Sequence, residues 1–235
     1  MIRAAIEKIL EMAAPTEIMI NGIDYTNRNI RPVSPPRTER LDFKSLKGLC
    51  DAIKAEHSKS IGELIVRVTG ATQVDVFSFP YGNDHQRDYL YSCKAQLPVH
   101  DFGHFITLEN MIIALRSKYV RTASLDEHIQ LVGSIFEESS VVTSDDGISQ
   151  NVAVRKGVAL KANKTINPIV RLTPFRTFSD VEQPASDFLF RIKEGGTAAL
   201  FEADGGAWEN EARRNIAMFL RTELEELKDI ITIAE

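Results

Sequence analysis

The side chains best suited to chemistry are concentrated in one stretch, residues 171–191, which combines arginines with phenylalanines. The planar guanidinium of arginine can clamp a phosphate or carboxylate, and an aromatic ring can stack on a base or on an apolar partner. The pattern therefore predicts a binding site for a ligand or partner. Its eight residues, the last one from the helix that follows, are Arg171, Phe175, Arg176, Phe178, Glu182, Gln183, Arg191 and Trp208.

The same stretch also fits a structural role. In that alternative the phenylalanines fill the hydrophobic core, and the arginines form ion pairs with Asp180, Glu182 or Asp187. Both interpretations stay open at the level of sequence.

Two histidines four residues apart, His100 and His104, have the spacing of zinc ligands on one face of a helix. Pro98 and Gly103 disfavour a helix there, and no glutamate follows His100 directly. No third ligand is evident, so we predict a loop without a metal.

Acidic and glycine pairs give two weaker candidates for ligand sites. Asp145 and Asp146 precede a glycine, a combination that is typical of a turn whose side chains bond to their own backbone. Gly205 and Gly206 lead into a helix, where backbone N–H groups could meet an anion, but Asp204 and neighbouring glutamates would repel it.

No nucleophile elbow of the form Gly-x-Ser-x-Gly occurs in the chain. We therefore expect a non-enzymatic protein without a cofactor. A hydrolase-type activity, built from side chains far apart in the sequence, is the alternative.

The elements that must position these residues begin with a helix at 2–13 and a second one at 45–55, both with apolar residues at helical spacing. Alternating apolar and polar residues then predict an antiparallel meander of three strands at 64–68, 74–79 and 88–95. Because one face of such a meander is apolar, it needs a helical cover.

Two more helices follow the meander. Thr107 can cap the first, and residues 124–127 read Ser-Leu-Asp-Glu, a capping box, at the start of the second. An Asn-Gly pair at 21–22 predicts an early hairpin. Further extended segments are predicted at residues 141–142, 152–154, 169–172, 188–192 and 198–201.

The clearest amphipathic helix covers residues 208–228, and a last strand is predicted at 230–233. The order of elements predicts an α+β fold of antiparallel sheets, a meander and hairpins, covered by amphipathic helices, with a long C-terminal helix. We predict an N-terminal part at 1–138 and a strand-rich part with the C-terminal helix at 139–235, or one continuous domain.

Charge and cysteine content narrow the function classes. The chain has 235 residues, a formal net charge of -5 and two cysteines, Cys50 and Cys93, which form no metal-binding or disulfide pattern. The acidic balance makes nucleic acid an unlikely partner. Residues 1–10 mix charges into their apolar positions, and no stretch is long enough to span a bilayer, so we expect a cytoplasmic protein with no membrane contact.

Three motifs of the arginine-rich stretch resemble the YfdQ-like family of uncharacterised bacteriophage and prophage proteins, a domain of unknown function. They are Leu-Thr-Pro-Phe-Arg-Thr-Phe at 172–178, Val-Glu-Gln-Pro at 181–184 and Phe-Leu-Phe-Arg at 188–191. Residues 197–208 and 25–53 are similar to proteins common in phages of Gram-positive bacteria. The resemblance implies a phage origin in a bacterial host, but no catalytic residues.

Phage origin and amphipathic helices lead to three expected functions. The first is a homo-oligomer that acts by binding, with counter-defence by capture of a host protein or a nucleotide-like signal as one form. The second is a scaffolding protein that builds a ring, shell or tube. The third is recombination-linked binding of single-stranded DNA, which the net charge disfavours.

Overall fold

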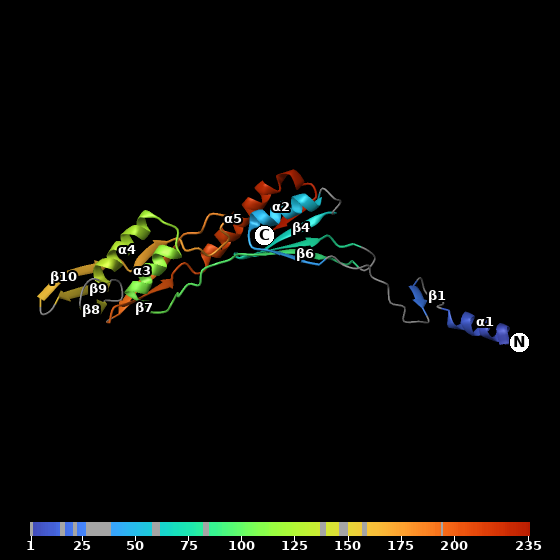
Figure 1. Ribbon diagram of the computed structural model, residues 1–235, viewed down its shortest axis with the longest axis horizontal. Helices are drawn as coiled ribbons and strands as arrows, with labels where there is room; N and C mark the ends of the chain where they lie inside the picture. The colour runs from blue at the N-terminus through green and yellow to red at the C-terminus, as the bar shows by residue number, and fades with distance from the viewer. Residues whose placement is uncertain are drawn as a thin grey trace. The chain divides into compact units, whose positions relative to one another are not determined.

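A computed structural model describes residues 2–14, 17–20, 23–26, 39–57, 62–81, 85–136, 140–145, 150–156, 159–193 and 195–235 (Figure 1). The predicted α+β class is confirmed, including mainly antiparallel sheets and a C-terminal helix. The chain divides into two compact units, Met1–Thr38 and Glu39–Glu235.

The smaller unit contains the predicted first helix, α1 (Ile2–Ala13), and two antiparallel strands, β1 (Glu17–Ile20) and β2 (Ile23–Thr26). The apolar side chains of α1 are exposed; Ile2, for example, is 79% accessible and Ile9 65%. The predicted Asn-Gly turn lies outside the described residues.

The first sheet of the larger unit contains β3 (Leu41–Phe43), β4 (Leu64–Gly70), β5 (Gln73–Ser78), β6 (Tyr89–Lys94) and β14 (Ile231–Ala234). Their order is β14-β4-β5-β6-β3. The central three strands form the predicted antiparallel meander, whereas β3 and β14 run parallel to their neighbours. The last strand of the chain is therefore one edge of this sheet.

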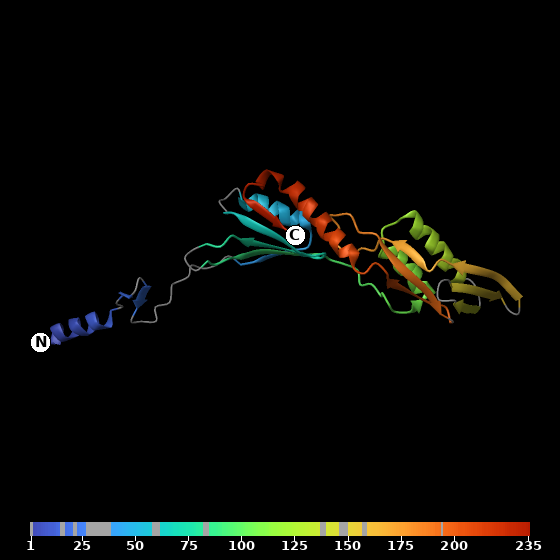
Figure 2. The same cartoon turned by 180° about the vertical axis from the view of Figure 1, so that it is seen from behind.

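Two helices, α2 (Leu46–His57) and α5 (Ala207–Glu223), lie side by side on one face of the five-stranded sheet (Figures 1 and 2). Alternate strand residues such as Val66 and Val76 are fully buried in the same core as Ile216 and Leu220 of α5. Burial of each such side chain contributes about 1.5–3 kcal/mol.

The second sheet of the larger unit consists of β7 (Ile106–Thr107), β11 (Ile169–Leu172), β12 (Ser186–Lys193) and β13 (Thr197–Glu202). Its order is β11-β12-β13-β7, with every pair antiparallel. It shares a core with α3 (Leu108–Ser117) and α4 (Ala123–Phe136). Phe188 and Phe190 of β12 are fully buried there.

A three-stranded antiparallel sheet follows α4 and consists of β8 (Ser140–Asp145), β9 (Gln150–Lys156) and β10 (Ala159–Ile166) in the order β10-β9-β8. The predicted strands at 141–142 and 152–154 lie in β8 and β9. Residues on both sides of position 138 contribute to the two larger sheets, because β14 completes the first and β7 the second.

The predicted caps of α3 and α4 differ in outcome. The Thr107 hydroxyl accepts a hydrogen bond from the backbone N–H of Asn110 at 3.2 Å, as predicted. The capping box at Ser124 is wrong, because the Thr122 hydroxyl accepts the hydrogen bond from the N–H of Leu125. The Ser124 hydroxyl instead donates to the carbonyl of Arg171 in β11, a contact distant in sequence.

Candidate functional site

The predicted binding stretch contains a segment that connects the two cores of the larger unit. This junction segment, residues 173–185, runs from β11 to β12. Phe178 is 1% exposed and belongs to the core of the five-stranded sheet. The adjacent Thr177 hydroxyl donates to the carbonyl of Ala71 at 2.5 Å. The segment therefore fastens the end of the second sheet to the first.

Arg176 lies at the centre of the junction segment and is only 4% exposed. Its Nη1 donates to Glu202 Oε1 at 2.7 Å, and its Nη2 donates to the hydroxyl of Ser186. The guanidinium lies over the ring of Trp208, with 4.1 Å from Cζ to the ring centroid. Burial lowers the pKa of Arg176, although Glu202 and Asp204 oppose this effect.

The Gln183 side chain fixes the backbone from Arg176 to Phe178. Its side-chain oxygen accepts hydrogen bonds from the N–H groups of Arg176 and Thr177, at 2.9 and 3.1 Å. Its Nε2 donates to the carbonyl of Phe178 at 2.8 Å. The buried Gln183 amide therefore supplies hydrogen-bond partners for two backbone N–H groups and for the backbone carbonyl of Phe178 in this turn.

The other predicted residues are not gathered around Arg176. Arg171 is exposed and pairs with Asp187 at 3.2 Å. Glu182 is exposed, and Phe175 and Arg191 are half-buried. Among the predicted residues, Arg176 contacts Trp208 through its guanidinium, and Gln183 bonds to the backbone of Arg176 and Phe178. The buried Phe178 and the pair of Arg171 with Asp187 fit the structural alternative, whereas Arg176 pairs with Glu202, which is not among the three acids expected there. A ligand role for the stretch stays a prediction.

In the glycine turn before α5, the carboxylate of Asp204 accepts a hydrogen bond from the turn's backbone. Gly205 and Gly206 have φ values of 62° and 81°, which favour glycine. Asp204 Oδ1 accepts from the N–H of Gly206, and Ser186 donates to Asp204 Oδ2 at 2.7 Å. Burial would raise the pKa of Asp204, but these hydrogen bonds and Arg176 lower it below its usual range.

The two histidines of the predicted metal-free loop are separated by the fold. His100 Nε2 lies 3.1 Å from the carbonyl oxygen of Phe175, and the ring stacks on Phe102. Burial lowers the pKa of His100, whereas His104 is exposed. In the part of the chain that the structure describes, no three His, Cys, Asp or Glu side chains are grouped as metal ligands.

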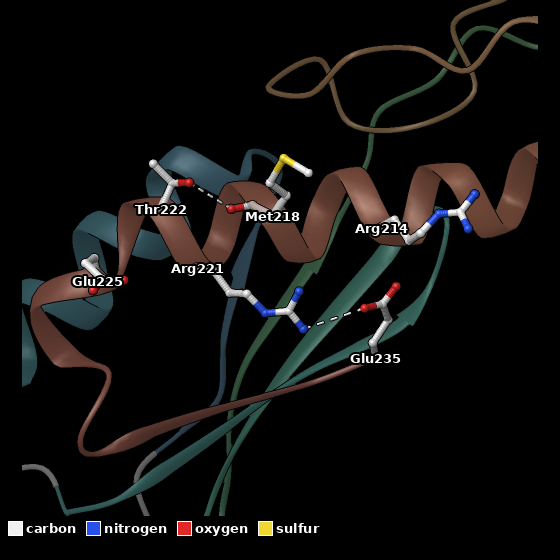
Figure 3. A pocket seen from close by; sticks show the side chains of 6 residues that line it. All are labelled: Arg214, Met218, Arg221, Thr222, Glu225 and Glu235. Carbon is white, nitrogen blue, oxygen red and sulfur yellow. Dashed lines mark hydrogen bonds and ion pairs between the residues drawn. The ribbon is translucent and has the colours of Figure 1, made fainter.

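An open cleft of about 410 Å³ lies between the C-terminal half of α5 and the end of β14 (Figure 3). We call it the edge cleft; its lining residues are Arg214, Met218, Arg221, Thr222, Glu225 and Glu235. A second hollow of about 290 Å³ shares Arg221 and Glu225 and adds Lys228, Ile231 and Ile233.

The edge cleft and the hollow beside it are lined by charged groups of both signs. Arg221 reaches from α5 to Glu235, with 3.6 Å between Nη2 and Oε2, as Figure 3 shows. Lys228 pairs with Glu225 at 2.9 Å. Met218 between the charged groups is 65% exposed. Met218 thus leaves apolar surface exposed among ion pairs, and contact with another protein would remove that surface from water.

The face of the five-stranded sheet opposite α2 and α5 carries a second group of polar and aromatic side chains. Asp75 is 6% exposed and accepts hydrogen bonds from Tyr89, Gln73, Thr69 and Ser92. Burial would raise the pKa of Asp75, but these hydrogen bonds lower it. Tyr89 also stacks on Phe77, with 4.8 Å between the ring centroids, and the guanidinium of Arg40 lies over the Tyr89 ring.

Sequence reasoning missed both the edge cleft and the Asp75 network. The helix at 208–228 and the strand at 230–233 were both predicted, but not that β14 is a sheet edge beside α5. The available signal was Met218, an apolar residue on the charged face of the predicted helix.

In comparisons with family models, curated proteins and solved structures, no match to this chain was found. The resemblance to the YfdQ-like family stays a prediction. Among the described residues, none of the helices combines the length and apolar character needed to cross a membrane.

Proposed function

We propose that this protein acts by binding and that it self-associates through the edge cleft. The observation that carries the proposal is an exposed Met218 among ion pairs, next to a sheet edge to which no described strand is paired. Both features favour association with another protein, because contact removes apolar surface from water and gives the backbone groups of the sheet edge hydrogen-bond partners.

Sedimentation velocity over a range of protein concentrations tests this proposal. We expect a reversible dimer, and Met218→Glu is expected to shift it toward monomer because a charge replaces the exposed apolar side chain. Ile113→Glu is the matched control, since Ile113 is also exposed on a helix, at 56%, but lies on α3. A monomer at every concentration, or equal effects of both substitutions, would contradict the proposal.

The resemblance to phage proteins supports a biological setting for this binding. We propose that the assembled protein captures a host protein or a nucleotide-like defence signal. The scaffolding alternative requires contacts that continue beyond two copies. Because an isologous contact closes at a dimer, the size of the assembly separates these two forms.

A second candidate function, binding of single-stranded DNA, is favoured by one observation. The stacked pair Phe77 and Tyr89 lies on the sheet face opposite the helices, with Arg40 over Tyr89 and Arg67 exposed on β4. Aromatic rings and arginines on such a face can stack on bases and hold phosphates. Oligonucleotide binding that weakens steeply with salt, and is lost in Arg67→Glu, would support it; no binding at low salt would contradict it.

A further inference from the structure

We infer that two copies of the chain join through β14, antiparallel about a two-fold axis at Ile233. Glu235 of each copy then completes the second hollow, the one beside the edge cleft, in the other copy. This pairing rests on the proposed self-association. A second copy of the chain covers the edge cleft, and its Glu235 becomes part of the site.

At the outer side of β14, backbone hydrogen-bonding groups face away from β4, and none of the described strands pairs with them. The carbonyl of Ile230 accepts from the N–H of Leu64 in β4 at 2.9 Å. Since backbone groups alternate in direction along a strand, Thr232 also faces β4, whereas Ile231 and Ile233 turn their N–H and C=O groups outward. An added antiparallel strand would satisfy these groups.

The two edges of the five-stranded sheet are protected to different degrees. At the β3 edge, Arg40 and Asp42 form an ion pair at 3.1 Å, and charged side chains discourage pairing with another strand. β14 reads Ile-Thr-Ile-Ala, which is β-branched at three of four positions and contains neither charge nor proline. The β14 edge is thus the one suited to pairing.

Side chains select the register of the pairing. Ile231 is buried in the core under α5, and Ile233 packs against the same core. If Ile233 lies opposite Ile233 of the second copy, all outward-facing backbone N–H and C=O groups from Ile231 to Glu235 gain hydrogen-bond partners in the second copy. Ile231 then lies opposite Glu235 of the second copy. Residues directly opposite in an antiparallel pair point to the same face, so this carboxylate enters the hollow beside Ile231.

The charges of that hollow complement the incoming carboxylate. Two cations, Arg221 and Lys228, line it together with Glu225, which pairs with Lys228. The Arg221 side chain is 57% exposed, so its guanidinium can donate to the incoming carboxylate as well as to Glu235 of its own copy. A two-fold axis also reverses the direction of α5, which brings the Arg214 end of one edge cleft toward the Glu225 end of the other. Met218, between these ends, then faces the edge cleft of the second copy.

A cysteine at the axis tests the register directly. We expect Ile233→Cys to form a disulfide-linked dimer under mild oxidation, because directly opposite Cα atoms about 5.5 Å apart suit a disulfide. Thr232→Cys is the matched control, since position 232 lies opposite 234. The native Cys50 and Cys93 are buried, and burial raises the pKa of each to about 12, so they give no background.

Charge reversal tests the carboxylate contact in the full chain. Glu235→Arg and Arg221→Glu should each raise the dimer dissociation constant by roughly tenfold, and the double reversal should restore most of the loss. A dimer in sedimentation without the Ile233 crosslink, or with equal crosslinking at 232, overturns the register while self-association stands. A chain that stays monomeric overturns both.

Discussion

The junction segment and the edge cleft both contain arginines beside aromatic or sulfur-containing side chains, but they differ in what surrounds the charge. Arg176 is 4% exposed, and its two Nη atoms donate to Glu202 and Ser186. Arg221 has a largely exposed side chain and a single long contact to Glu235. A dense motif of arginines and aromatic residues can thus mark where a protein is held together, whereas an accessible arginine can lie in a stretch of ordinary composition.

The largest effect is expected from Phe178→Ala in the junction segment. Removal of a fully buried phenylalanine leaves a cavity in the core of the five-stranded sheet, and we expect a loss of about 4 kcal/mol in the free energy of unfolding. Urea denaturation measures this loss. Ile113→Ala, at an exposed position of α3, should cost less than about 0.5 kcal/mol; a similar small loss for Phe178 would mean that the segment does not join the cores.

Arg176→Ala should come next, at about 3 kcal/mol, because it removes a buried side chain that packs on Trp208 and donates to Glu202 and Ser186. Arg171→Ala, which breaks only the exposed pair with Asp187, should cost less than about 0.5 kcal/mol. Equal losses in urea denaturation would abolish the distinction between a buried and a surface arginine in this stretch.

A smaller, pH-dependent effect is expected from Asp204 in the turn before α5. Its folded-state pKa lies below the ordinary value of 3.8, so the stability it contributes is present above that value and is lost as the pH falls through the folded-state pKa. Asp204→Asn should make acid unfolding less steep. Asp187→Asn provides the comparison, because the Asp187 carboxylate forms an exposed pair with Arg171. Identical acid-unfolding profiles for the wild type and Asp204→Asn would contradict this account.

Changes in the edge cleft should have the smallest effect on the fold. Met218→Glu alters an exposed position, so the free energy of unfolding of the monomer should change by less than about 0.5 kcal/mol. The dimer of this variant should dissociate more readily than the wild-type dimer. If chemical denaturation of dilute protein instead showed a loss as large as that of Phe178→Ala, the cleft would be part of the core and not a contact surface.

Elements with strong periodicity could be predicted from the sequence, and their arrangement could not. The meander and α5 follow from local patterns of apolar residues, and Thr107 follows from cap chemistry. Thr122 replaced Ser124 as the cap of α4 because Ser124 is drawn to the carbonyl of Arg171 in β11. Such long-range contacts leave no local signal.

The candidate sites show the same limit. The chemistry of the arginine-rich stretch was visible, but its burial depended on Gln183 and Trp208 closing around Arg176. The edge cleft depends on strand order, since β14 becomes an edge only because it pairs with β4 on one side. A pattern along the chain does not contain that order.

Amide hydrogen exchange of the unmodified protein, followed from dilute to concentrated solution, tests the central claim most directly. If two copies pair through β14, the N–H groups of Ile231 and Ile233 should exchange more slowly as the concentration rises, whereas those of β3 at the opposite edge should not change. Exchange at Ile231 and Ile233 that does not depend on concentration, in a sample that sedimentation shows to be dimeric, would contradict the pairing.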